Sequence, residues 1–301
     1  MIKELMKCIR EYKKPSILAP ILVSLEVVME CTIPFLIAML VNQIKAGAEF
    51  SILVKYGLLL IVMATLSLMF GIGAGNACAT ASCGFAKNVR KDLYAKIQEF
   101  SFENIDKFSS SSLVTRLTTD VTNVQNAYMM IVRIAVRCPL MFLFAFTMAF
   151  IMGGKMACIF LLVVPVLGFG LYMVIRTAMP LFRKVFHKYD ELNNSIQENI
   201  KGMRVVKSYV REDHEISKFE QACQNVYRLF VRAERGLVLN APVMQLTVYG
   251  CILLLCWLGA KMIVGSSLTT GELMSLLTYC MNILMSLMML SMVFVMVTMS
   301  M

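Results

Sequence analysis

The chain has 301 residues, of which 58% are hydrophobic and only 16% are charged, and its mean hydropathy is +0.72. Soluble domains carry about 25% charged residues, so this composition argues against a soluble globular protein. The net charge is +10, but no basic and aromatic surface stands apart from the apolar runs, which argues against a nucleic-acid partner. The composition therefore predicts a membrane protein.

The chain begins with MIKELMKCIREYKKP, which is basic and amphipathic. We interpret residues 1–14 as an interfacial helix that stays attached to the protein. The apolar run that follows is too long for the core of a signal peptide and shows no small-x-small cleavage site.

Six apolar runs follow, and each is long enough to cross a bilayer as a helix, which takes about 20 residues. They cover residues 15–41, 52–86, 127–152, 155–182, 236–264 and 270–301. The last run is still apolar at Met301, so we expect it to be truncated. The pattern predicts an all-α membrane protein in which one domain, 15–301, contains six long transmembrane helices.

Lysine and arginine are distributed very unevenly around these runs. Residues 1–14 hold five of them, residues 87–137 hold eight and residues 176–235 hold twelve. The other side of the membrane keeps only Lys45, Lys55, Lys155 and Lys261. Positive residues concentrate on the cytosolic side of membrane proteins. We therefore expect a multi-pass protein of the plasma (inner) membrane, with the N-terminus and both long loops in the cytosol.

The two long inner connections, 87–126 and 183–235, mix charged and apolar residues at helical spacing and contain no proline. We expect the helices of the second and fourth runs to continue past the bilayer, turn and return as two helical intracellular loops. The stretch FSSSS (108–112) and the charged stretch REDHE (211–215) mark the turns, because clustered serines compete with the helical backbone.

Two carboxylates lie inside the first apolar run. Glu26 and Glu30 are four residues apart and therefore share one face of a helix. Charged groups inside a bilayer are costly and usually face a cavity or a partner. The pair indicates either a polar cavity wall that favours cationic substrates or a buried structural hydrogen bond.

Two arginines, Arg133 and Arg137, share a helix face at the inner end of the third run. One interpretation is that both snorkel toward the cytosolic interface. The other is that they line a basic inner vestibule or pair with Glu26 or Glu30.

Methionine is frequent, with 26 residues, and it recurs at helical spacing along the last run. Flexible thioethers suit adaptable binding surfaces, but the same stripe also suits ordinary helix packing. The methionines that could line a substrate cavity are Met281, Met285, Met288 and Met292.

Small residues recur every four positions along the second run, which predicts close helix packing. The ridge consists of Gly71, Gly75, Ala79 and Cys83.

No enzyme chemistry is visible in the chain. The ten cysteines form no CxxC or CxxH pair, and most lie in apolar runs, where a thiol behaves as a small hydrophobe. We find no nucleophile–base pair, no metal-ligand cluster and no phosphate-binding loop. The sequence therefore predicts no catalytic residues, no metal site and no cofactor bound by this chain.

Three passages in order now point to a family: SSLVTRLTTDVTNVQ (111–125), IQENIKGMRVVKSYVREDHEISKF (196–219) and GAKMIVGSSLTTGELMSLLTYCMNILMSLMMLS (259–291). Together they resemble the transmembrane domain of a bacterial ATP-binding cassette (ABC) exporter half-transporter of the multidrug, lipid or peptide type. The resemblance covers essentially the whole chain. It implies six long helices and two intracellular loops that each end in a short coupling helix.

The resemblance also implies which residues couple the membrane domain to its motor. The first coupling helix would contain Glu103, Asn104, Ile105, Asp106, Lys107 and Phe108. The second would contain Val210, Arg211, Glu212, Asp213, His214 and Glu215. Many relatives have glycine ahead of the Leu-x-x-Arg-Leu motif, whereas this chain has serines at 109–112.

The sequence contains no motif of a nucleotide-binding domain, because the phosphate-binding pattern GxxxxGK[ST] occurs nowhere in it. In the family a nucleotide-binding domain follows the sixth span on the same polypeptide. We therefore expect this chain to be part of a longer protein, with ATP and Mg²⁺ bound by the nucleotide-binding domain.

The resemblance implies a second half-transporter as partner, in a homodimer or a heterodimer, within the lipid bilayer, and a small-molecule, lipid or peptide substrate. Two other classes stay open. One is a secondary carrier or channel without an ATPase, and the other is a membrane scaffold or sensor that binds partners through its cytosolic hairpins.

Overall fold

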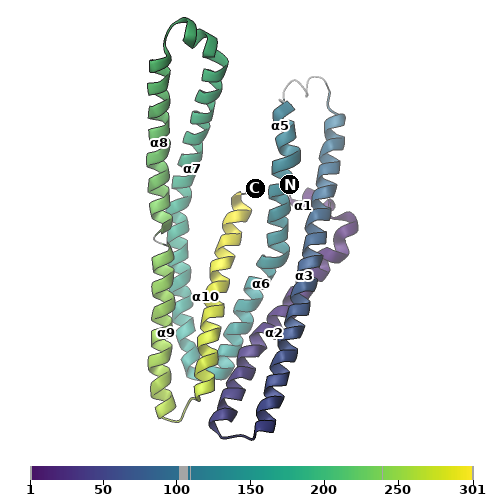
Figure 1. Cartoon of the computed structure of the whole chain (residues 1–301), viewed down its shortest axis with the longest axis vertical. Helices are drawn as coiled ribbons and strands as arrows, with labels where there is room; N and C mark the ends of the chain where they lie inside the picture. The colour runs from purple at the N-terminus through teal and green to yellow at the C-terminus, as the bar shows by residue number, and fades with distance from the viewer. Residues whose placement is uncertain (1, 102–107, 109, 239, 300–301) are drawn as a thin grey trace. The chain divides into compact units, whose positions relative to one another are not determined.

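The computed structural model of the chain describes residues 2–101, 108, 110–238 and 240–299. The regular elements of these residues are all helical (Figure 1). The chain divides into two compact units. The first comprises Met1–Phe160 and Cys251–Met301, and the second comprises Leu161–Gly250.

The first unit is built around four long helices. Its elements are α1 (Ile2–Lys7), the 3-10 turn η1 (Arg10–Tyr12), α2 (Lys13–Lys45), α3 (Phe50–Gln98), α5 (Ser110–Thr115), the π-helical turn η2 (Arg116–Asp120), α6 (Val121–Gly153), the 3-10 turn η3 (Gly154–Ala157), the later part of α9 (Asn240–Val264) and α10 (Thr270–Met299). Helix α2 packs against α3, α6 and α10, and α6 also packs against α3 and α10.

The second unit is a helical hairpin. Most of α7 (Cys158–Ser208) leads through a short turn at 209–211 into α8 (Glu212–Val238), and the first part of α9 follows (Figure 1).

Among the described residues, five helical stretches are long and apolar enough to cross a membrane. They are Arg10–Lys45, Phe50–Gln98, Ser112–Gly153, Gln245–Val264 and Thr270–Leu290. These match five of the six predicted runs. The remaining run, 155–182, begins in η3 and continues into α7, part of whose side chains lie outside the described set. The count of six membrane crossings therefore stays a prediction.

The predicted continuation of the second and fourth runs as helices is confirmed. Helix α3 has 49 residues and α7 has 51. At about 1.5 Å per residue each is roughly 75 Å long, more than twice the thickness of a bilayer core. Both helices must therefore extend well beyond the hydrocarbon if they cross it.

The N-terminal stretch does not form a single helix over 1–14. Helix α1 ends at Lys7, and the backbone of Arg10 has a positive φ of 39°. Arg10 pairs with Asp92 of α3 at 3.0 Å, and the Asn88 side chain donates to the Cys8 carbonyl at 2.9 Å. These contacts fasten the segment to the C-terminal half of α3.

The predicted small-residue ridge of α3 is only partly correct. Ala79 and Cys83 are exposed, and the buried face of the helix runs instead through Ala74, Ala77, Cys78, Ala81, Ser82 and Phe85. Spacing of four drifts around a helix of 3.6 residues per turn, so a short ridge does not define the packed face. Gly71 and Gly75 meet charged side chains of α2 and α6.

The loop ends of α2 and α10 are tied together by hydrogen bonds. Thr269 and Glu272 form a reciprocal capping box, in which each backbone N–H donates to the other side chain, at 2.7 and 3.2 Å. The Asn42 amide donates to Thr269 Oγ1 at 3.0 Å and accepts from the backbone N–H of Gly271 at 3.1 Å. This contact requires a close approach of the two backbones.

Gly271 provides that close approach, which leads to a prediction. A Cβ at this position would collide with the Ala38 carbonyl oxygen and would lie 2.7 Å from Asn42 Oδ1. We expect Gly271→Ala to destabilise the protein by about 1–3 kcal/mol, as overpacking does. The measurement is the thermal unfolding midpoint of the purified protein in detergent.

Gly57→Ala is the matched control, because no atom lies within 4 Å of its Cβ position. It should leave the midpoint unchanged or raise it, since alanine favours a helix over glycine by roughly 0.5–1 kcal/mol. Equal midpoints for the two variants would show that the tie between α2 and α10 is not closely packed.

Candidate functional site

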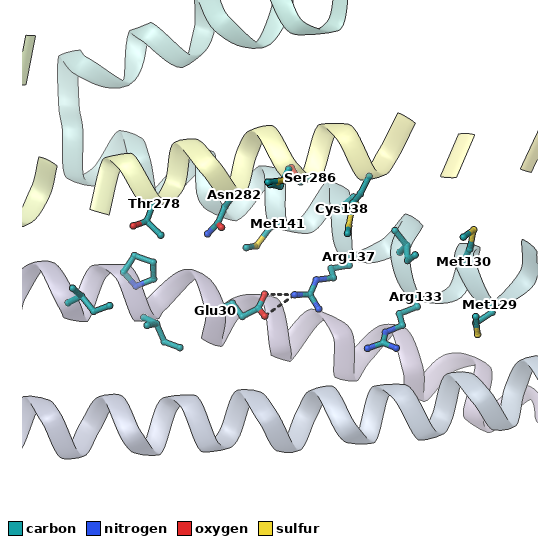
Figure 2. Close-up of a pocket in the computed structure, with 16 residues that line it drawn as sticks. Glu30, Met129, Met130, Arg133, Arg137, Cys138, Met141, Thr278, Asn282 and Ser286 are labelled. Atoms are coloured by element: carbon teal, nitrogen blue, oxygen red, sulfur yellow. Dashed lines mark hydrogen bonds and ion pairs between the residues drawn. The ribbon is translucent and has the colours of Figure 1, made fainter. Parts of the chain in front are cut away.

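A cavity of about 700 Å³ lies among α2, α6 and α10 of the first unit (Figure 2). Its wall consists of Glu30, Ile33, Pro34 and Ile37 from α2, Met129, Met130, Arg133, Ile134, Arg137, Cys138 and Met141 from α6, and Thr278, Asn282, Met285, Ser286 and Met289 from α10. Cavities of 300–1,000 Å³ with a few polar groups in an apolar lining are the usual form of small-ligand sites.

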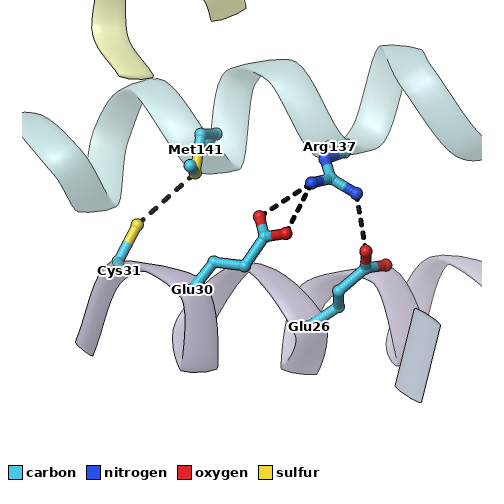
Figure 3. A network of polar contacts seen from close by, with 5 residues as sticks. All are labelled: Glu26, Glu30, Cys31, Arg137 and Met141. Atoms are coloured by element: carbon cyan, nitrogen blue, oxygen red, sulfur yellow. Dashed lines mark hydrogen bonds and ion pairs between the residues drawn. The ribbon is translucent and has the colours of Figure 1, made fainter. Parts of the chain in front are cut away.

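The strongest polar feature of this wall is a bridge from α6 to α2 (Figure 3). Arg137 Nη1 donates to Glu26 Oε1 at 2.6 Å, and Nη2 donates to both oxygens of Glu30 at 2.8 and 2.7 Å. One guanidinium thus holds two carboxylates one helical turn apart. Of the interpretations that the sequence left open for the two arginines, the structure shows pairing with Glu26 and Glu30 for Arg137.

The bridge is shielded from solvent to different degrees along its length. The side chain of Glu26 is 9% exposed, whereas those of Glu30 and Arg137 are 30% and 29% exposed. Charges taken out of water are costly unless they are paired and hydrogen-bonded. We infer that neither carboxylate would tolerate this position without Arg137.

Helix α3 packs against the bridge at Glu26. A Cβ at Gly71 would lie 3.2 Å from Glu26 Oε1, so the absent side chain makes room for the carboxylate. The second oxygen, Oε2, is buried and has no hydrogen-bond partner among the described residues. Spacing alone marked Gly71 as a packing residue, and its contact with Glu26 depends on the relative register of α2 and α3.

Arg133 lies one turn before Arg137 and also lines the cavity (Figure 2). Within the described part of the chain it forms no ion pair or hydrogen bond. Its Nη1 lies 3.9 Å from the Cβ position of Gly75 on α3. The two arginines, which looked equivalent in the sequence, therefore occupy different environments.

Helix α10 contributes hydroxyl and amide groups that sequence analysis did not single out. Asn282 points from α10 toward α2 in Figure 2. The hydroxyls of Thr278 and Ser286 donate to carbonyls of their own helix, at 3.1 and 2.8 Å, which leaves their oxygens able to accept. The sequence did carry a signal for them: positions 278, 282 and 286 are polar within an apolar run and, being four residues apart, share one helix face.

Only one member of the predicted methionine stripe lines the cavity. Met285 lines the cavity, whereas Met281, Met288 and Met292 are exposed elsewhere on α10 and do not contribute to its wall. The cavity instead takes Met129, Met130, Met141 and Met289. These residues come from two helices, so no periodicity within one run could identify them together.

A sulfur contact and a buried hydroxyl continue the wall beside the bridge. The Cys31 thiol lies 3.5 Å from Met141 Sδ (Figure 3), and the Tyr279 hydroxyl donates to the Cys31 carbonyl at 2.8 Å. Tyr279 is fully buried. The contacts join α2 to both α6 and α10 at the level of the cavity.

The first predicted coupling segment falls largely outside the described residues, because 102–107 are not described. Phe108 is described. Its ring stacks on Phe100 with centroids 5.8 Å apart, and the Arg116 guanidinium lies 5.0 Å from its centroid.

The second predicted coupling segment is the turn between α7 and α8. Val210 and Arg211 lie in the turn, while Glu212, Asp213, His214 and Glu215 form the first turn of α8 rather than a separate helix. Tyr209 and Val210 are 75% and 81% exposed, and Val210 has a positive φ of 49°. A β-branched residue with this backbone conformation is strained.

An ion pair stabilises the same turn. The Lys207 ammonium donates to Glu212 Oε1 at 3.0 Å, and this hydrogen bond lowers the pKa of Glu212 below its ordinary value. A lowered carboxyl pKa means that the contact is present at neutral pH and is lost only as the pH falls through that lowered value.

The described residues contain no group of three or more His, Cys, Asp or Glu side chains that could hold a metal ion. The cavity itself offers groups that can bind a ligand: a paired charge bridge, a further guanidinium and an adaptable apolar lining.

Comparison with known proteins gives a consistent set of relatives. Residues 16–297 match the family described as the ABC transporter transmembrane region. The chain is 32% identical to an uncharacterized ABC transporter ATP-binding protein of Bacillus subtilis (strain 168), over 88% of this chain and 46% of that protein. It is 26% identical to one of Mycobacterium tuberculosis (strain H37Rv), over 94% of this chain and 49% of that protein.

A third relative is the ATP-dependent lipid A-core flippase of Pseudomonas savastanoi pv. phaseolicola. It is 24% identical over 80% of this chain and 40% of its own length. The chain thus spans about half the length of the curated relatives it matches.

The bridge leads to a prediction about stability. Arg137→Met leaves two carboxylates without their partner, and we expect it to destabilise the protein by about 3–5 kcal/mol, as loss of one member of a buried ion pair does. Combining it with Glu26→Gln and Glu30→Gln should restore most of the loss. The measurement is the free energy of unfolding by titration with sodium dodecyl sulfate in mixed micelles.

Arg232→Met, on the exposed face of α8, is the matched control and should change stability by less than about 0.5 kcal/mol. If Arg137→Met behaves like this control, the bridge does not hold α2 against α6.

Proposed function

The chain belongs to the ABC transporter transmembrane region family, and on this premise we propose that it is the membrane-spanning part of an ATP-driven exporter. In this role it forms the translocation pathway and passes the movement of a nucleotide-binding domain to the substrate site. The full protein's activity, partners and substrate are all part of the proposal.

The observation that carries the proposal is the cavity among α2, α6 and α10. It lies between helices that are long and apolar enough to cross a membrane, and it combines an apolar lining with a few charged and polar groups. A compartment of this kind can hold an amphiphilic compound within the bilayer.

The proposed topology has six membrane crossings, with the N-terminus and both helical hairpins in the cytosol. The asymmetry of lysine and arginine supports this orientation, since twenty-five of them belong to the inner side and four to the outer. Residues 155–182, most of which lie in α7, supply the crossing that completes the six.

We propose that the turn between α7 and α8 contacts the nucleotide-binding domain. Two apolar side chains, Tyr209 and Val210, are exposed there beside the acidic first turn of α8. Exposed aromatic residues are typical anchors of protein interfaces, and the strained backbone of Val210 presents them at the end of a long helix. Residues 103–108 are proposed to make the equivalent contact in the first hairpin.

The motor is proposed to be a nucleotide-binding domain that binds ATP and Mg²⁺. The Bacillus and Mycobacterium relatives carry the words ATP-binding protein in their names and are about twice as long as the region they share with this chain. A second half-transporter, either a copy of this chain or a related one, would complete the pathway. Because one relative is named as a lipid A-core flippase, amphiphilic lipids join small molecules and peptides as candidate substrates.

A carrier driven by an ion gradient is a second candidate, and one observation favours it. The bridge of Glu26, Glu30 and Arg137 places ionisable groups deep in the predicted first and third spans, where ion-coupled carriers bind their coupling ions. Arg137 occupies both carboxylates, which makes them poor sites for a coupling cation.

ATP dependence separates the two candidates. We expect the product of the complete reading frame, reconstituted in liposomes, to transport a fluorescent amphiphile with Mg-ATP and without any ion gradient. Transport driven by a proton or sodium gradient in the absence of ATP would overturn the exporter proposal in favour of the carrier.

The coupling proposal yields its own prediction. In the same liposomes, the double change Tyr209→Ser and Val210→Ser should lower transport by about tenfold, as loss of an interface anchor does, while basal ATP hydrolysis remains. Tyr189→Ser is the matched control, because this tyrosine is also exposed on α7 but lies away from the turn. Equal transport by the two variants would exclude the turn as the coupling contact.

A further inference from the structure

The charges around the cavity are not equally available to a ligand. Both oxygens of Glu30 already accept hydrogen bonds from Arg137, and so does Oε1 of Glu26. The remaining oxygen, Glu26 Oε2, is buried, and Glu26 does not belong to the cavity wall. A cation in the cavity would therefore find no free carboxylate oxygen on the described wall.

One positive charge on the wall, in contrast, is available to a ligand. Arg133 lines the cavity, and its guanidinium has no ion-pair or hydrogen-bond partner among the described residues. Its position is six residues, or about 9 Å along a helix, inside the apolar run that begins at 127. An arginine at such a depth normally pairs with another group or lines a watery cavity.

The other groups of the wall are also suited to an anionic amphiphile. Asn282 offers an amide that can donate, and it too has no described partner. Five methionines surround these groups, and flexible thioethers adapt to apolar bodies of different shapes. Among the described residues, the cavity wall thus offers one cationic donor without a partner, a neutral amide and a large adaptable apolar surface.

We propose that this cavity binds amphiphiles that carry an anionic group, a phosphate or a carboxylate, with that group paired to Arg133 and the apolar part against the methionines. Guanidinium groups match both anions because their N–H donors can bind two oxygens at once. The inference rests on the proposed export function for its biological role. It takes the place of one of the two interpretations of Glu26 and Glu30, in which they form a cavity wall that favours cationic substrates.

Binding to the full chain, purified in neutral dodecyl maltoside, tests the proposal without any transport assay. The probes are decyl phosphate and decyltrimethylammonium, which share the apolar chain and differ in the sign of the head group. Isothermal titration should show that the wild-type protein binds the phosphate at least about tenfold more tightly, as a charge-assisted hydrogen bond would provide. Equal or inverse affinities would overturn the proposal, and this comparison needs no variant.

Variants assign the preference to one residue. Arg133→Gln should abolish it, Arg133→Lys should keep most of it, and Arg232→Gln on the exposed face of α8 should not change it. Size-exclusion profiles and unfolding midpoints verify that each variant is folded. A preference that survives in folded Arg133→Gln would overturn the assignment.

Competition distinguishes the source of the anion. Displacement of decyl phosphate by phosphatidylglycerol but not by phosphatidylcholine would support an anionic lipid head group as occupant, and displacement by neither would support a soluble anionic amphiphile. Equal displacement by both lipids would show that the apolar chain alone is recognised and would overturn the proposal. The exporter proposal is tested by ATP dependence and the binding proposal by head-group preference, so failure of one can be told from failure of the other.

Discussion

The architecture of the first unit depends on one guanidinium and two carboxylates. Arg137 of α6 holds Glu26 and Glu30 of α2 at hydrogen-bond distances, within helices that are apolar enough to cross a membrane. Charges that are largely removed from water are costly unless they are paired, so separating the three groups would require the helices to rearrange. This requirement fixes the register of α2 against α6, and Gly71 allows α3 to close over Glu26. The cavity wall is therefore set by electrostatics as much as by packing.

The same bridge shapes what the cavity can bind. Arg137 donates to both oxygens of Glu30 and to one oxygen of Glu26, so a cationic substrate would find no free oxygen of Glu30 on the wall, while Arg133 lines the cavity without a partner among the described residues. Helix α7 runs without a break from Cys158 to the turn at 209–211, which is the proposed coupling contact. A rigid helix transmits displacement from one end to the other, which is the mechanical role proposed for the coupling turn.

Much of this could be predicted from the sequence, because hydrophobic length and charge asymmetry are local properties. The apolar runs lie in helices, and the second and fourth runs continue as the long helices α3 and α7. Glu26 and Glu30 were singled out by the cost of a charge in an apolar run, and Arg133 and Arg137 by their shared helix face. Which arginine pairs with the carboxylates could not be predicted, because the choice between Arg133 and Arg137 depends on the relative register of two helices. The cavity methionines were missed for a similar reason, since they come from both α6 and α10. The ridge of α3 was partly wrong because two of its four members, Ala79 and Cys83, are exposed.

The central claim is that the cavity beside the bridge is the compartment through which substrate passes. Thiol labelling at Asn282 tests it most directly, in a chain whose native cysteines are replaced and where Asn282→Cys supplies the only thiol. A water-soluble methanethiosulfonate should label this position from the cytosolic side in the absence of nucleotide, and a transported compound should slow the labelling. Trapping the complete protein with Mg-ATP and vanadate should reduce cytosolic labelling further. A thiol that is inaccessible under all conditions, or equally accessible with and without substrate and nucleotide, would contradict the account.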